Sequence, residues 1–317
     1  MADELDAPHP RDARDGLVLA ERRNLLGLGY RMTGTLADAE DVVQESYARW
    51  YRLTPAERDA VLNPAAWLTR VAGRVALDLL GSARARREHY VGQWLPEPLP
   101  AGLFTGTGSA APASLDPLER VALDDTVGSA LLLVLETMTP AERVAFVLHD
   151  VFAVPFDQIA SIVDRSPAAA RQLASAARSR LRSTRTATSR NPNPVSPRHH
   201  DDTVRAFLSA ARTGDLLTLM AVLSPEIELR SDGGGVVNAA RQAVHGTDHV
   251  ARFVLGVLSK NPHTTFTEQP TADGLGYRLD VGGRLYGIVT FDVADGLVTS
   301  VRLMLNPAKL TSWPSLP

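Results

Sequence analysis

Two low-complexity segments divide this chain of 317 residues into three pieces, and they constrain its fold more than any other feature. Residues 96–114 are rich in proline, glycine, alanine and serine with a single charge, and residues 186–199 contain three prolines. Both compositions are typical of extended or flexible linkers. We therefore predict domains over residues 15–95, 115–185 and 200–312, joined by a flexible linker over 96–114 and a second linker over 186–199.

The first piece is predicted to be helical. Thr35 and Asp38 have the spacing of a capping box, and apolar side chains recur at helical spacing over residues 39–50. A second helix is predicted to start at Asn63 and Pro64, a cap followed by a first-turn proline. The apolar stripe of the first helix is expected to be buried. Its other face carries five acidic or amide side chains: Asp38, Glu40, Asp41, Gln44 and Glu45.

The second piece is predicted to end in a helix-turn-helix. A short apolar helix over 156–163 is followed by a turn at 164–165, and Ser166 and Pro167 cap and open the next helix. Arginines on the outer face of such a second helix can reach base edges in the major groove. Many helical hairpins share this spacing, so it is only moderately specific. The polar residues expected on that face are Arg171, Gln172, Ser175, Arg178 and Arg182.

The third piece has a different pattern. Two helices are predicted over residues 202–223, broken at Gly214 and Asp215, and alternating runs such as PEIELRS and YRLDVG follow. The dipeptide Asp295-Gly296 is a strong hairpin signal. We predict an α+β domain with a curved antiparallel sheet and helices on one face.

Composition excludes several classes of protein. The chain has no cysteine, which rules out disulfides, thiolate metal sites and cysteine nucleophiles. It has no run of about 18 apolar residues, and its charged first residues lack a signal-peptide core. We expect a cytoplasmic protein without a membrane partner. His245 and His249 lie four residues apart without an obvious third ligand. A general base in an apolar pocket is conceivable among these two histidines and Asp232, Asp248 and Asp280. We assign no metal, cofactor or catalytic residue, and expect no enzyme activity.

Five motifs, taken in order, resemble a known family. LADAEDVVQESYARW at 36–50 with NPAAWLTRVAGRVALDLLGSARARRE at 63–88 resembles region 2 of bacterial extracytoplasmic-function (group IV, sigma-70 family) sigma factors. TPAERVAFVLHDVFAVPFDQIASIVDRSPAAARQLASAARSRLR, starting at residue 139, resembles their region 4. The third piece resembles a SnoaL-like, nuclear-transport-factor-2-like cone fold. Together with YVGQWLPEPL at 90–99, DGGG at 232–235 and NPAKL at 306–310, it is similar to the sigma-J-like subgroup.

The resemblance implies partners for the two helical pieces. The acidic face would dock on the largest subunit of core RNA polymerase, although acids in a first helical turn are also typical of a solvated surface. Region 2 would read and open the −10 element, and region 4 would read the −35 element of promoter DNA, with Arg171 and Gln172 at base edges. The remaining DNA-binding candidates are Asn63, Arg70, Arg74, Arg84, Arg86, Arg87, Ser166, Ser175, Arg178 and Arg182.

The resemblance also implies regulation in cis by the SnoaL-like domain. The segment at 90–99 could be a plain linker, but its tryptophan and leucine favour burial against another surface. The interdomain regulatory candidates are Trp94, Leu95, Pro96, Glu97, Pro98, Asp232, Gly233, Gly234, Gly235, Asn306, Pro307, Lys309 and Leu310. We expect a sigma factor that contacts the largest and second-largest polymerase subunits and promoter DNA. A small-molecule ligand of the third domain stays open. Two alternatives are a ligand-sensing one-component regulator and an enzyme with an accessory DNA-binding region.

Overall fold

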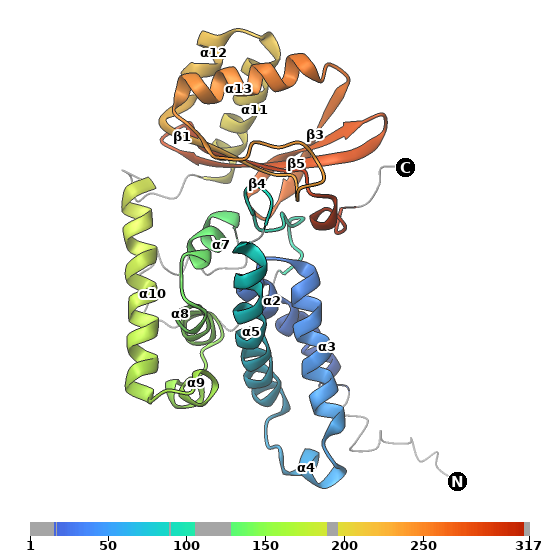
Figure 1. The fold of residues 1–317 in the computed structure, drawn as a ribbon, viewed down its shortest axis with the longest axis vertical. Coiled ribbons are helices and arrows are strands. Elements are labelled where there is room, and N and C mark those ends of the chain that lie inside the picture. Colours follow the sequence, from blue (N-terminus) through green and yellow to red (C-terminus); the bar gives the residue numbers. More distant parts are fainter. Residues whose placement is uncertain (1–15, 17, 89, 105–127, 189–195, 314–317) are drawn as a thin grey trace, which may run out of the picture.

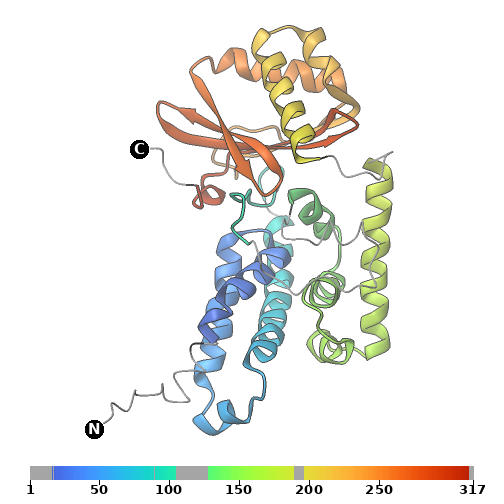
Figure 2. The ribbon, with the colours of Figure 1, turned by 180° about the vertical axis from the view of Figure 1, so that it is seen from behind.

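The computed structural model describes residues 16, 18–88, 90–104, 128–188 and 196–313, without the side chains of 83–88 and 184–188. Figures 1 and 2 show two helical parts side by side, with an α+β domain lying across one end of both. This arrangement confirms the predicted fold class of two helical regions followed by an α+β domain. Among the described residues, no helix is long and apolar enough to cross a membrane.

The first helical part contains α2 (Arg22–Thr33), α3 (Leu36–Arg52), α4 (Pro55–Ala60) and α5 (Pro64–Glu88). Thr35 caps α3 by accepting a hydrogen bond from the backbone N–H of Asp38, as its spacing predicts. The predicted apolar stripe of α3 is buried, with Ala39, Val42 and Trp50 among its members. The face of α3 that carries the acids is left to the outside.

The second helical part contains α7 (Ser129–Glu136), α8 (Pro140–Phe146), the π-helical turn η1 (Val147–Val151), α9 (Phe156–Val163) and α10 (Pro167–Thr188). Between α9 and α10 the chain turns at Asp164, whose φ of 53° is left-handed. Ser166 then accepts a hydrogen bond of 3.2 Å from the backbone N–H of Ala169 and caps α10. These residues form the predicted helix-turn-helix.

The α+β domain contains three helices, α11 (Pro197–Thr213), α12 (Leu216–Ala221) and α13 (Thr247–Lys260), and a sheet formed by β1 (Leu223–Asp232), β2 (Val244–His245), β3 (Thr264–Thr271), β4 (Gly274–Val281), β5 (Arg284–Ala294) and β6 (Leu297–Met304). The strand order is β2-β1-β6-β5-β4-β3. Four of the five described strand pairs are antiparallel, as predicted, whereas β1 pairs in parallel with β6, which the prediction of an antiparallel sheet did not include. The first strand of the domain, β1, therefore lies beside its last strand, β6, although the two are far apart in the sequence. The short helix η2 (Pro307–Lys309) follows β6.

The two helical parts share one hydrophobic core, although we predicted them as separate domains. A Cβ at Gly73 of α5 would lie 2.8 Å from the side chain of Leu148, so the backbone of one part touches a side chain of the other. The guanidinium of Arg143 donates a 2.7 Å hydrogen bond to the carbonyl of Met32 and fastens the same contact. The described helical parts are therefore one packed body.

The α+β domain has its own core between the helices and one face of the sheet. The other face of the sheet carries Ile288 and Met304, which form a small cluster with Leu95, Leu310 and Trp313. We expected a flexible linker over 96–114, but residues 95–99 are buried between the helical body and this face of the sheet. The tryptophan and leucine that precede the prolines explain why this stretch is held. Residues 105–114 lie outside the described part of the chain.

Candidate nucleic-acid and interdomain interfaces

The acidic face of α3 is presented to solvent with part of its charge already paired. Asp41 and Gln44 are exposed. Glu40 forms an ion pair with Arg22 at 2.7 Å, and Glu45 forms one with Arg49 at 2.8 Å. The hydrogen bond from Arg49 lowers the pKa of Glu45, so this carboxylate is ionised at neutral pH. Asp41 is the most accessible acid of the face and the best placed for a basic partner.

The candidates for reading the −10 element lie around the start of α5. Asn63 is exposed and caps α5, accepting a 3.0 Å hydrogen bond from the backbone N–H of Ala66. Arg70 is exposed about two helical turns into α5. Trp67 packs edge-on against Trp50 with ring centroids 5.3 Å apart, which places it in the core rather than at a DNA surface. Arg84, Arg86 and Arg87 have side chains outside the described part of the structure.

Arg74, the third candidate on α5, also contacts the second helical part. Its guanidinium donates a 2.7 Å hydrogen bond to the carbonyl of Ile162, at the end of α9. It also lies 3.9 Å from Asp78. Arg74 thus joins the two helical parts while staying exposed, and its contact with DNA stays a prediction.

The outer face of α10 carries the predicted readers of the −35 element. Arg171, Gln172 and Ser175 are exposed there. The guanidinium of Arg171 lies 5.6 Å from the ring centroid of Phe156, a cation–π contact that holds the side chain at the start of the helix. Arg182, further along α10, is also exposed. Ser166 is exposed at the helix N-terminus, with its hydroxyl engaged as the cap.

Arg178 is a correction to the predicted DNA interface. Its guanidinium makes two-pronged hydrogen bonds to Asp150, with Nη2 2.6 Å and Nε 3.1 Å from the carboxylate oxygens. Asp150 is 1% exposed, so it needs a fixed counter-ion. The fork that could hold a phosphate is therefore used to neutralise a buried acid inside the second helical part.

A buried polar cluster connects residues 90–99, which we call the strap, to the α+β domain. The carboxylate of Asp232 accepts hydrogen bonds from the Tyr90 hydroxyl at 2.6 Å, the Leu95 backbone at 2.9 Å and the Gly234 backbone at 2.9 Å. Lys309 completes the set at 2.7 Å. This buried acid thus has several donors and one counter-charge, which is what a buried ion pair requires.

Lys309 is held as fully as its partner. Its ammonium group donates a 2.6 Å hydrogen bond to the Leu95 carbonyl and lies 4.3 Å from the ring centroid of Trp94 and 5.1 Å from that of Tyr90. Asn306 donates to the Tyr90 hydroxyl at 2.8 Å. Burial, followed by the hydrogen bond to Asp232, raises the pKa of Tyr90 well above its usual value, so this hydroxyl stays protonated as a donor.

The other end of the strap grips the first helical part. Glu97 accepts a 2.8 Å hydrogen bond from the backbone N–H of Leu36, the first residue of α3, and its own N–H donates to the Gly34 carbonyl at 2.9 Å. Tyr30 donates its hydroxyl to the Glu97 carbonyl at 2.5 Å. At Gly34, where φ is 78°, a Cβ would lie 2.6 Å from Trp94, so only glycine fits.

The predicted interdomain residues therefore lie together in the structure. Of those thirteen residues only Gly235 and Pro307 are exposed. Val236, which follows DGGG, and Ala308, within NPAKL, are exposed and lie outside the Asp232–Lys309 contact. Prediction from sequence missed the roles of Tyr90, which lies within the quoted strap motif, and of Trp313, which donates to the Pro98 carbonyl at 3.0 Å.

The acids considered as catalytic bases are engaged in ion pairs. Asp280 lies 2.9 Å from Arg278 on the strap side of the sheet, and Asp248 lies 2.9 Å from Arg252 on the surface of α13. Asp232 is paired with Lys309. Among the described residues, no group of three or more histidines and acids is placed to hold a metal ion.

A helical body with an exposed acidic helix on one part and an arginine-bearing helix-turn-helix on the other is the architecture of a transcription initiation factor of the sigma type. Family models agree: residues 17–86 match sigma-70 region 2, and residues 129–181 match sigma-70 region 4.

Comparison with whole proteins extends this to the α+β domain. The chain is 38% identical over 309 residues to the ECF RNA polymerase sigma factor SigJ of Mycobacterium tuberculosis strain ATCC 25618 / H37Rv, covering 93% of this chain and 92% of the relative. It is 35% identical over 292 residues to the probable ECF sigma factor SigI of strain CDC 1551 / Oshkosh, covering 92% of each. The crystal structure of SigJ matches with a TM-score of 0.71 and 33% identity, over 96% of this chain and 100% of that one. The chain belongs to the ECF sigma factors, which act in transcription initiation.

Proposed function

We propose that the α+β domain regulates this sigma factor in cis by holding its two DNA-reading surfaces in a closed arrangement. The observation that carries the proposal is the buried contact between Asp232 and Lys309, closed over the strap by Leu95. The strap continues from this contact to the cap of α3 at Glu97. One continuous segment therefore joins the regulatory domain to the helix that carries the acidic face.

The closed arrangement is too short for a promoter. The −35 and −10 elements are named for positions about 25 base pairs apart, or about 85 Å of B-form DNA. In the structure, Arg74 touches the carbonyl of Ile162. Arg70 lies one turn from Arg74, about 6 Å, and Arg171 follows Ile162 by nine residues, which cannot span more than about 32 Å. The two reading surfaces must separate before both elements can be bound together.

In the open form, each surface has its own role. The acidic face of α3, with Asp41 and Gln44 exposed, docks on a basic surface of core RNA polymerase. Arg171 and Gln172 read base edges of the −35 element, and Asn63 and Arg70 contact the −10 element. Arg84, Arg86 and Arg87 bind phosphates without sequence preference, so their contribution weakens as salt rises.

The test removes the buried pair without leaving a charge behind. The double variant Asp232→Asn with Lys309→Met is compared with the intact chain in transcription by core polymerase at limiting amounts of either protein. The matched control is Glu228→Gln with Arg230→Met, which removes a part-exposed 2.8 Å pair on the same strand. We expect more initiation with the first variant only. Equal initiation with all three proteins would contradict regulation in cis.

A small-molecule ligand of the α+β domain stays a prediction. An open groove of about 650 Å³ lies between the C-terminal ends of α11 and α13 and the start of β3, with Arg212 and Phe266 in its wall. The alternative of a one-component regulator is not favoured, because residues 17–86 match a polymerase-docking and promoter-opening region that such a regulator does not need.

A further inference from the structure

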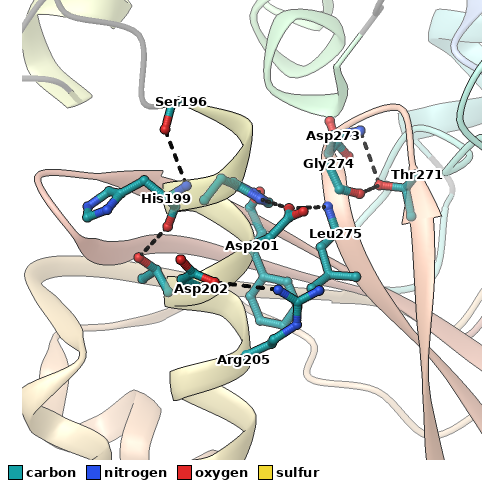
Figure 3. A network of polar contacts seen from close by, with 12 residues as sticks. Ser196, His199, Asp201, Asp202, Arg205, Thr271, Asp273, Gly274 and Leu275 are labelled. Atoms are coloured by element: carbon teal, nitrogen blue, oxygen red, sulfur yellow. Dashed lines mark hydrogen bonds and ion pairs between the residues drawn. The ribbon is translucent and has the colours of Figure 1, made fainter.

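The turn between β3 and β4 lies beside three other segments of the chain, two of which belong to the strap and to the second helical part. Its Ala272 backbone donates a 2.9 Å hydrogen bond to the carbonyl of Leu99, at the end of the strap. Leu275 donates at 3.2 Å to the carboxylate of Asp201, near the start of α11, as Figure 3 shows. The third contact is made by Asp273, and it reaches the second helical part.

Asp273 supplies the N-terminal cap of α7. Its carboxylate accepts the backbone N–H of Ser129 at 2.6 Å and the Ser129 hydroxyl at 2.6 Å. The N-cap residue of α7 is Gly128, which has no side chain to do this. The first N–H groups of a helix have no partner within the helix, and they favour a negative charge nearby. A carboxylate 144 residues away in the sequence satisfies one of them here.

Asp273 is held in place from within its own domain. The guanidinium of Arg302 lies 3.7 Å from its carboxylate, and Arg302 is 3% exposed. Arg302 is itself fixed by Asp292 at 2.8 Å and by the Thr290 hydroxyl at 3.2 Å. The Asp273 backbone N–H donates to the Thr271 hydroxyl at 3.1 Å. The Asp273 side chain is therefore held in position by its own domain before it caps α7.

We propose that Asp273 is a positioning residue that holds region 4 in the closed form, as a latch distinct from the strap. The strap reaches region 2 through Glu97, whereas Asp273 reaches region 4 through Ser129. In each sigma region, a carboxyl group from elsewhere in the chain thus caps the N-terminus of one helix: Glu97 caps α3 and Asp273 caps α7. The proposal rests on the proposed regulation in cis and adds that the two regions are released at separate contacts.

The first test measures the position of region 4 in the full chain. Because the chain has no cysteine, Ser161→Cys on α9 and Ser259→Cys on α13 accept a unique pair of spin labels, and both serines are exposed. We expect Asp273→Ala to raise the population at longer distances about tenfold, as loss of hydrogen bonds to a charged acceptor would do. Asp273→Asn keeps one acceptor oxygen and should give an intermediate population. Asp202→Ala, an exposed acid nearby on α11, is the matched control and should give none.

The second test is a gain of function, which a merely structural role would not produce. With core polymerase and limiting protein, Asp273→Ala should increase initiation severalfold on a template carrying both elements. It should not do so on a template whose −35 element is replaced, because freeing region 4 helps only where it has a site. Ser129→Ala removes only the hydrogen bond from the hydroxyl and should act more weakly in the same direction. Combining it with Asp273→Ala should add little, since Asp273→Ala already removes both hydrogen bonds to Ser129.

The outcomes separate the two proposals. If Asp273→Ala leaves distances and initiation unchanged while Asp232→Asn with Lys309→Met raises initiation, the latch is refuted and the strap stands. If neither variant raises initiation, both the latch and the proposed regulation in cis are refuted. Should Asp273→Ala not fold, Asp273→Asn and Ser129→Ala decide by the same readings, and two folded variants without any gain would overturn the latch.

Discussion

The ammonium group of Lys309 lies 2.7 Å from the carboxylate of Asp232, and both side chains are at most 7% exposed. Asp232 ends β1 and Lys309 lies in η2 after β6, 77 positions away. The two side chains meet over the backbone of Leu95, whose N–H donates to Asp232 and whose carbonyl accepts from Lys309. Leu95 belongs to the strap, so the strap covers the ion pair between Asp232 and Lys309. Moving the strap away would therefore expose both charges to water.

Lys309→Met should destabilise the folded chain by about 3–5 kcal/mol, because it leaves the Asp232 carboxylate buried without a counter-charge. Adding Asp232→Asn should restore part of that loss, since no buried charge is then unpaired, but the hydrogen bond from Lys309 to the Leu95 carbonyl stays lost and leaves the strap more weakly held. Urea unfolding at neutral pH measures both free energies. Equal losses in the single and the double variant would show that the pair is not the unit of stability.

Glu97 should make stability depend on pH in an unusual direction. Burial raises the pKa of this carboxyl above its ordinary value of 4.5, outweighing the hydrogen bond from Leu36. The folded state then holds a proton that the unfolded state has released, so the free energy of unfolding falls as pH rises from about 4.5 through the raised pKa.

Glu97→Gln keeps an oxygen that can accept from Leu36 and removes the titration. The difference in unfolding free energy between the variant and the intact chain should therefore shift in favour of the variant as pH rises across that window. Urea titrations at several pH values between 4.5 and 7.5 give this difference directly. A constant difference would show that Glu97 titrates normally in the folded chain.

Arg171 and Arg178 should separate recognition from stability. Arg171→Ala should weaken binding to the −35 element, with a loss of about 1–3 kcal/mol for one base contact, and leave the unfolding free energy nearly unchanged. Arg178→Ala should instead cost about 3–5 kcal/mol of stability, because the buried Asp150 loses its two-pronged ion pair with Arg178. Anisotropy with −35 DNA and urea unfolding together measure the contrast. A stable Arg178→Ala protein with weak DNA binding would return Arg178 to the interface.

Asp41→Arg should abolish binding to core RNA polymerase without unfolding the chain, because Asp41 is exposed and its side chain is not needed for the core of α3. The matched control is Glu226→Arg, the same charge reversal at an exposed site on β1. Co-purification with core polymerase and circular dichroism check binding and fold. Retained binding by a folded Asp41→Arg chain would remove this face from the docking surface.

The sequence was sufficient to predict several of the helices, because their signals are local, whereas α2 and α4 were not predicted. Thr35 and Ser166 cap where their spacing predicts, and the break at Gly214 and Asp215 separates α11 from α12. The composition of residues 96–114 was misleading because burial of this segment depends on distant residues. Prolines suit both a flexible linker and an extended segment buried between two surfaces, and the local sequence does not distinguish the two.

Long-range partners were beyond sequence patterns. Arg178 has the spacing of an outward-facing residue, but its partner Asp150 lies 28 positions earlier on another helix. Arg74 likewise meets a carbonyl 88 positions away. The cap that Asp273 provides for α7 could not be predicted from sequence. Gly128 at the N-cap position has no side chain to serve as the cap, and nothing in the local sequence indicates which distant residue replaces it.

Transcription in vitro tests the central claim most directly. Core polymerase is supplied with the intact chain, with Asp232→Asn and Lys309→Met, or with the Glu228→Gln and Arg230→Met control, on a template carrying the chain's own upstream region. We predict a defined start that requires the chain and rises when the buried pair is neutralised. No start with any of the three, together with no binding to core polymerase, would contradict the proposed function.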